Sequence, residues 1–268
     1  FDEILASFLI SSEIRKKIKK IKKKSKKFSQ QPFITTIKKL NFNLTNDQNN
    51  TLKEINNDFS SKSKMFRLLQ GDVGSGKTIV ALISALNAIE SGCQVALMAP
   101  TEILAMQHYK LAKNLFSKKI NLEILTSKTD NIKKKEIHRE ISNKKVNMIF
   151  GTHSLFQKKI NFSNLGYIII DEQHKFGVRQ RKQLSDKGGD NCDVLLMSAT
   201  PIPRTLIMSI YGDMDISIIK EKPNHRKEIK TYSKLENKLV DVINFVKKQI
   251  NDENQIFWVC PIIKESKK

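Results

Sequence analysis

The chain has 268 residues, a length sufficient for one large or two ordinary domains. Of these residues 39% are hydrophobic and 28% charged, and the formal net charge is +21. Its apolar runs are much shorter than a membrane-spanning helix needs, and the acidic-then-basic N-terminus is the wrong order for a secretory signal, so we expect a cytoplasmic protein. Cys93, Cys192 and Cys260 lie far apart without a CxxC pair, which argues against a disulfide framework or a zinc site.

The positive charge is concentrated near the N-terminus. In IRKKIKKIKKKSKK, residues 14–27, most residues are Lys or Arg, while Ile14, Ile18 and Ile21 recur at helical spacing. The pattern predicts a basic amphipathic helix within residues 1–33, broken at Pro32. Its cationic face fits nucleic acid or a docking surface on another domain, but a solvated linker helix would look the same, and AT-rich coding bias also enriches lysine.

Residues 34–222 alternate short apolar runs with helical stretches. The runs that predict strands are, in chain order, MFRLLQ, QVALMAP, LEILTS, VNMIFGT, YIIIDE and VLLMSAT. Continuous apolar runs are typical of strands covered on both faces by helices. We therefore expect an α/β domain with a mostly parallel sheet between helices.

A second unit is predicted after EKPNHR. Its expected elements are a strand over 227–232, a helix over 236–250 and a strand over 255–261. Because a strand, a helix and a strand cannot bury a core by themselves, we interpret residues 223–268 as the truncated start of a second domain.

The first chemical motif is QGDVGSGKT, residues 70–78, between a predicted strand and a predicted helix. It fits G-x-x-x-x-G-K-[ST], in which backbone N–H groups and a helix N-terminus hold phosphates. In such a loop Lys77 reaches the β- and γ-phosphates and the Thr78 hydroxyl binds Mg²⁺. The residues expected to bind ATP here are Gly71, Asp72, Val73, Gly74, Ser75, Gly76, Lys77 and Thr78.

Two neighbouring carboxylates, Asp171 and Glu172, follow the apolar run YIII. A strand that reaches the surface also ends on polar residues, so the pair alone does not identify a site. Beside a phosphate-binding loop, however, an acidic residue at the carboxyl end of the same sheet holds the metal. We assign Asp171 to Mg²⁺, Glu172 to activation of the attacking water as a general base, and Lys77 as the second catalytic residue.

An ordered series of motifs resembles superfamily 2 helicases. The series is LTNDQ (44–48), the loop, APTEILAMQH (99–108), GTHSLF (151–156), DEQH (171–174) and SATPIPRTL (198–206). Within that superfamily, GDVGSGKT, DEQHKFGVRQR, MSATPIPRTL and VCPIIKES resemble the RecG family of ATP-dependent DNA helicases over nearly the whole chain. The transcription-repair coupling factors are the next most similar family, but they typically have Glu at Gln173, an aromatic residue at Ser75, and no VCPIIKES.

The resemblance implies a RecA-like ATP-binding domain over 34–222, a preceding linker helix from a wedge domain, and the start of a second RecA-like domain. Gln48 would read the adenine edge, or else simply follow a helix N-cap at Thr45. The implied DNA track, built mostly from phosphate contacts, consists of Pro100, Thr101, Glu102, Gly151, Thr152 and His153.

Coupling between the γ-phosphate and DNA is the next role that the resemblance implies. The residues concerned are Gln173, His174, Ser198, Ala199 and Thr200. His174 is also compatible with a buried structural role. We interpret His108, His138 and His225 as surface or structural residues, and Lys175, Arg179 and Arg181 as a basic edge facing DNA, a neighbouring domain or solvent.

The expected function is that of the ATP-binding half of a DNA translocase that remodels stalled forks and branched DNA. ATP and Mg²⁺ are the expected cofactors and branched or forked DNA the partner, with no membrane, no other small-molecule substrate and a monomeric chain. The resemblance places the arginine fingers in the second motor domain, so this chain should bind ATP but hydrolyse it slowly.

Other functions remain possible at this point. One is a coupling-factor-like duplex translocase, and another is a nucleotide-gated DNA-binding module without efficient turnover. A small-molecule P-loop kinase is disfavoured because it has no use for SATPIPRTL or the basic helix.

Overall fold

The computed structural model describes residues 22–29, 36–38, 40–156, 160–172, 189–200, 214–221 and 230–259. The chain divides into two compact units, Phe1–Asn224 and His225–Lys268. None of the described helices is long and apolar enough to cross a membrane.

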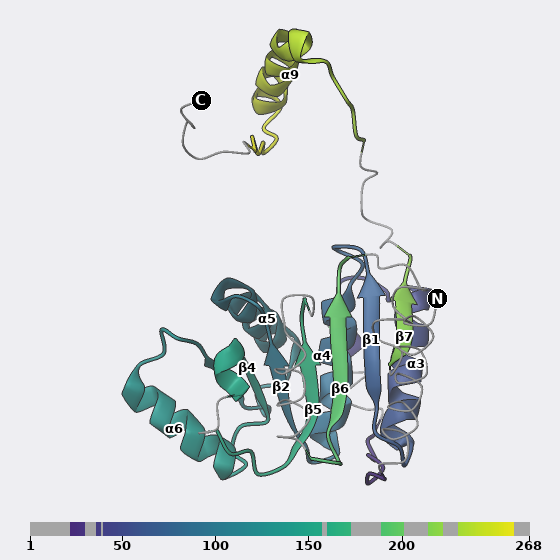
Figure 1. Cartoon of the computed structure of the whole chain (residues 1–268), viewed down its shortest axis with the longest axis vertical. Helices are drawn as coiled ribbons and strands as arrows, with labels where there is room; N and C mark the ends of the chain where they lie inside the picture. Colours follow the sequence, from purple (N-terminus) through teal and green to yellow (C-terminus); the bar gives the residue numbers. More distant parts are fainter. Residues whose placement is uncertain are drawn as a thin grey trace, which may run out of the picture. The chain divides into compact units, whose positions relative to one another are not determined.

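The first unit is built on a seven-stranded parallel sheet of order β3-β4-β2-β5-β6-β1-β7 (Figure 1). The strands are β1 (Phe66–Gly71), β2 (Gln94–Met98), β3 (Leu122–Leu125), β4 (Met148–Gly151), β5 (Leu165–Ile170), β6 (Asp193–Ser198) and β7 (Asp215–Ile219). The helices are α3 (Asn46–Ser60), α4 (Lys77–Glu90), α5 (Glu102–Leu115), α6 (Asn131–Ser142) and the 3₁₀ helix η1 (His153–Phe156).

Two apolar clusters cover opposite faces of this sheet. Alternate strand residues such as Leu195 and Leu196 fall in different clusters, as the pleat requires. One cluster includes buried residues of α3, α4 and α5, and the other includes those of α6. The predicted α/β fold with a parallel sheet between helices is confirmed.

All six predicted strands are present as β1 to β6, but β7 was not predicted. It lies at the edge of the sheet beside β1, and only two of its five residues are buried. An edge strand of this kind keeps one side and part of its faces in solvent, and its polar residues Asp215 and Ser217 interrupt the apolar pattern.

Residues 22–29, which we call the basic arm, correct the prediction of a continuous basic helix. The arm is not helical: Lys22 forms an antiparallel bridge with Ser63, and the Lys26 amide donates to the Phe59 carbonyl at 2.8 Å. These partners lie in the last turn of α3 and in the segment between α3 and β1, so the arm crosses the amino-terminal edge of the sheet. The earlier residues of the predicted helix lie outside the described ranges.

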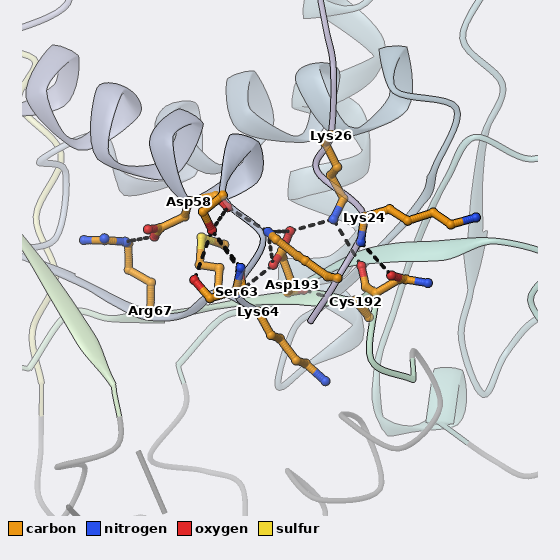
Figure 2. A network of polar contacts seen from close by, with 12 residues as sticks. Lys24, Lys26, Asp58, Ser63, Lys64, Arg67, Cys192 and Asp193 are labelled. Atoms are coloured by element: carbon orange, nitrogen blue, oxygen red, sulfur yellow. Dashed lines mark hydrogen bonds and ion pairs between the residues drawn. The ribbon is translucent and has the colours of Figure 1, made fainter. Parts of the chain in front are cut away.

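The arm contributes two lysines to a buried charge cluster around Asp193, the first residue of β6 (Figure 2). Lys23 Nζ lies 2.7 and 2.8 Å from the two carboxylate oxygens, and Lys26 Nζ lies 2.5 Å from Oδ2. The Met65 amide donates to Oδ1 at 2.7 Å, and Asp193 has no exposed surface. The prediction that these two lysines belong to a cationic outer face is therefore wrong, because they neutralise an internal carboxylate.

The second unit contains η3 (Glu236–Lys238) and α9 (Leu239–Asn251), which together match the predicted helix. The predicted strands do not form where the structure describes them, at 230–232 and 255–259. A strand is stable only when it pairs with a neighbour, and within 230–259 there is none. The helix has no buried residue in the described structure, and Val240 and Phe245 are 67% and 60% exposed.

Candidate ATP-binding site and DNA track

The motif residues that the structure describes converge on one edge of the sheet. Because every strand pair is parallel, the carboxyl ends of β1, β6 and β5 are adjacent, and those of β2 and β4 follow. The first three ends carry the phosphate-binding loop, the Ser198 motif and the Asp171 pair. The other two carry the residues of the implied DNA track. Ligands bind at this edge in open parallel sheets.

Glycines shape the phosphate-binding loop between β1 and α4. Gly74 and Gly76 have φ values of 80° and 88°, which residues with a Cβ rarely adopt, and Gly76 directly precedes the first helical residue. A Cβ on Gly71 would lie 2.6 Å from Ser75 Oγ and 2.9 Å from the Ile219 carbonyl oxygen. The loop is thus tightly folded around a helix N-terminus, as a phosphate cradle requires.

Lys77 and Ser75 show that this cradle fits a bound phosphate. Lys77 Nζ donates to the carbonyls of Gly71 at 2.5 Å and Asp72 at 2.9 Å. Burial lowers the pKa of Lys77, and the Asp171, Glu172 and Asp72 carboxylates oppose that shift. The Ser75 hydroxyl is buried and has no hydrogen-bond partner within the described structure. A buried cation and an unpaired hydroxyl are groups that phosphate oxygens satisfy.

Gln48 agrees with the capping interpretation in its position but not in its exposure. Thr45 is the N-cap of α3, and Gln48 completes a capping box, with its Oε1 accepting from the Thr45 amide at 3.0 Å. Gln48 is nevertheless buried, not exposed, and its Nε2 donates to the Ser75 carbonyl at 2.8 Å. This side chain therefore supports the phosphate-binding loop directly, while its proposed contact with adenine stays a prediction.

The two carboxylates after β5 differ in their surroundings. Asp171 is buried, its amide donates to the Met98 carbonyl at 2.8 Å, and its Oδ2 lies 2.8 Å from His108 Nε2. Glu172 is partly exposed and has φ 51°, a left-handed conformation that costs a residue with a Cβ about 1–2 kcal/mol. Strained backbone of this kind clusters at functional sites.

The contact of His108 with Asp171 was not predicted, since the sequence interpretation gave His108 no part in the site.

Oxygen ligands on Thr78 and Asp171 suit Mg²⁺, which keeps part of its water shell beside nucleotide phosphates. When bound, Mg²⁺ would neutralise charge on the β- and γ-phosphates.

The Ser198 motif is tied to the strand that leads into the phosphate-binding loop. Ser198, at the end of β6, is buried, and its hydroxyl lies 2.9 Å from that of Thr200. The Thr200 carbonyl accepts a hydrogen bond from Gln70 Nε2 at 3.2 Å. The chain from Ser198 through Ala199 to Thr200 thus lies beside the last residues of β1, as a group sensing the nucleotide would need.

The implied DNA track consists of two turns next to each other. Thr101, after Pro100, caps α5 by accepting from the Leu104 amide at 3.3 Å. The Glu102 carboxylate accepts from the Ser127 amide at 2.8 Å. Gly151 ends β4 and leads through Thr152 into η1, which starts at His153.

These turns are held in place by backbone contacts. The carbonyl of Gly151 accepts from the Ala99 amide at 2.9 Å. A Cβ on this glycine would lie 2.3 Å from the Leu125 carbonyl oxygen. DNA contact by these turns remains a prediction.

Some residues of the sequence interpretation lie outside the described residues. They are the predicted coupling residues Gln173 and His174, the basic residues Lys175, Arg179 and Arg181, and His225.

Comparison with known proteins agrees with this arrangement. The chain is 45% identical over 270 residues to the ATP-dependent DNA helicase RecG of Aquifex aeolicus, covering 100% of this chain and 34% of that protein. It is 46% identical over 243 residues to the RecG of Bacillus subtilis, covering 90% of this chain and 36% of that protein. The chain thus spans about a third of the length of these curated relatives.

Solved structures give the same result. A structure of RecG bound to a three-way DNA junction superposes with a TM-score of 0.84 at 40% identity, over 94% of this chain and 34% of that one. The similarity to RecG is therefore confirmed, and the coupling factor is not favoured. A profile of the DEAD/DEAH box helicase family matches residues 45–208, and the chain belongs to that family.

Proposed function

We propose that this chain is the ATP-binding part of a DNA motor that remodels forked or branched DNA through ATP hydrolysis. One observation carries the proposal: a single sheet edge joins a phosphate cradle, the Asp171 and Glu172 carboxylates and the turns of the implied DNA track. The RecG relatives support branched DNA as the partner, because one of the similar solved structures is that of a RecG bound to a three-way DNA junction.

Each residue has a defined task in this proposal. Lys77 and the backbone amides of the loop bind and orient the phosphates, with Thr78 and Asp171 binding Mg²⁺. Glu172 accepts a proton from the attacking water as the water oxygen bonds to the γ-phosphorus and the bond from that phosphorus to the departing oxygen of ADP breaks. Its left-handed backbone turns the chain sharply after β5, so that neighbouring carboxylates need not point at the same atom.

The test is single-turnover ATP hydrolysis with excess protein, with and without forked DNA. In the unaltered chain, forked DNA should raise the rate, and Glu172→Gln should lower it by about 10²–10⁴ while nucleotide binding persists. Glu253→Gln is a matched control, since Glu253 also has positive φ, 59°, but belongs to the other unit.

Either of two results would count against the proposal. An equal rate in the Glu172→Gln variant would show that the base is elsewhere. The second result is an affinity for forked DNA that changes with the bound nucleotide, together with an ATP hydrolysis rate that neither DNA nor Glu172→Gln alters. That combination would instead identify a nucleotide-gated binding module.

A further inference from the structure

His108 is a polar side chain on the buried face of α5. The buried residues of this helix are Ala105, His108, Ala112 and Leu115, so the histidine stands where an apolar residue would pack. Burying an imidazole without a partner is costly. Its Nε2 lies 2.8 Å from Asp171 Oδ2, so this hydrogen bond is what makes the position tolerable.

The hydrogen bond crosses the boundary between the two parts of the site. Asp171 follows β5, at the end of the nucleotide part, whereas α5 follows β2 and begins at Thr101 in the implied DNA track. These two strands are neighbours, and the Asp171 amide already donates to the Met98 carbonyl of β2. The Asp171 backbone is thus fixed by β2, and its side chain by the helix that follows β2.

The chemistry of this pair defines what His108 does. An ionised carboxylate only accepts hydrogen bonds, so Nε2 must carry the hydrogen. One N–H on Oδ2 fixes the rotation of the carboxylate and leaves Oδ1 for another ligand. Partners of this type orient metal-binding groups, and removing them typically costs about 10–100-fold in metal affinity.

We infer that His108 is a positioning residue for the Asp171 carboxylate and, through it, for the magnesium ion that accompanies the nucleotide. The inference rests on the proposed function, since it assigns Mg²⁺ to Asp171. It adds a residue of α5 to a metal site otherwise formed by the phosphate-binding loop and β5. The orientation of the metal ligand therefore depends on the helix whose N-terminus belongs to the implied DNA track.

The experiment measures the affinity of the 268-residue chain for a fluorescent, non-hydrolysable ATP analogue, first in EDTA and then across a magnesium titration. His108→Phe and His108→Leu remove the donor, and two apolar variants keep the test possible if one does not fold. His108→Gln restores an N–H near the position of Nε2. His138→Phe, on α6 and away from the site, is the matched control.

The expected result distinguishes a loss of magnesium affinity from a loss of nucleotide affinity. His108→Phe and His108→Leu should leave the affinity in EDTA unchanged and raise the magnesium concentration for half-maximal effect about 10-fold or more. His108→Gln should recover most of the loss, and His138→Phe should have no effect. Circular dichroism of each variant verifies folding.

Two results would overturn the inference but would not count against the proposed function. One is an unchanged magnesium response in both apolar variants. The other is an equal loss of analogue affinity in EDTA and in magnesium, which would mean that His108 only supports packing. If the unaltered chain binds no analogue under either condition, the proposed function itself is refuted.

Discussion

Replacing Asp193 by asparagine should strongly destabilise the first unit. The variant keeps an oxygen for the Met65 amide but leaves Lys23 and Lys26 without a compensating charge. The two lysine side chains are only 0% and 4% exposed, so water cannot solvate them in place. Removing one partner of a buried pair costs about 3–5 kcal/mol, a large part of the roughly 5–15 kcal/mol by which domains are stable.

Urea unfolding followed by circular dichroism measures this loss. Asp190→Asn is the matched control, because Asp190 is exposed and three residues away, and it should change stability by less than about 0.5 kcal/mol. The loss at Asp193 should persist at high salt, since buried charges are weakly screened.

A combined variant tests whether uncompensated charge is the cause. Lys23→Met and Lys26→Met, added to Asp193→Asn, remove both buried cations and keep their apolar length. Apolar replacement of buried charges is often neutral or better, so the triple variant should regain most of the lost stability. If it stays as unstable as the single variant, or if Asp193→Asn matches its control, the charge argument is wrong.

Two further predictions concern a glycine and a cysteine. Gly76→Ala should lower nucleotide affinity about tenfold or more, because φ is 88° and the added Cβ would lie 2.3 Å from Gln48 Nε2. Gly92→Ala is the control, because Gly92 has φ 78° but open surroundings. It should cost about 1–2 kcal/mol of stability and leave nucleotide affinity unchanged. Burial raises the pKa of Cys192 from near 9 to about 12, so its contribution to stability is present below pH 9 and lost as the pH rises towards 12. At pH 8 iodoacetamide should therefore modify it far more slowly than the partly exposed Cys93, and equal labelling rates would contradict this.

The sheet could be predicted because burial on both faces leaves a strong mark in sequence. Strands β2, β4, β5 and β6 are fully buried, and a motif begins at or directly after the last residue of each, so their type and the position of the site followed together. The edge strand β7 has a mixed pattern, which periodicity alone does not separate from a loop.

Long-range polar pairing could not be predicted. The lysine-rich sequence of the basic arm is typical of a solvated helix, and only the fold shows that Lys23 contacts a carboxylate 170 positions later in the chain. A weaker signal did exist for His108: it lies between Ala105 and Ala112 at the spacing that places residues on one face of a helix, here the buried face of α5. A titratable residue in that place needs a partner, but the sequence does not say which.

Among the described residues, Asp193 and Asp171 are buried carboxylates whose surroundings differ, and the difference explains why one is structural and the other suits a ligand. Asp193, at the amino edge, receives hydrogen bonds from two lysines and a backbone amide, so both its oxygens are already occupied. Asp171, at the carboxyl edge, has its Oδ2 held by one histidine. A carboxylate can hold a metal only if an oxygen remains for it and its rotation is fixed, and a single donor from α5 satisfies both conditions.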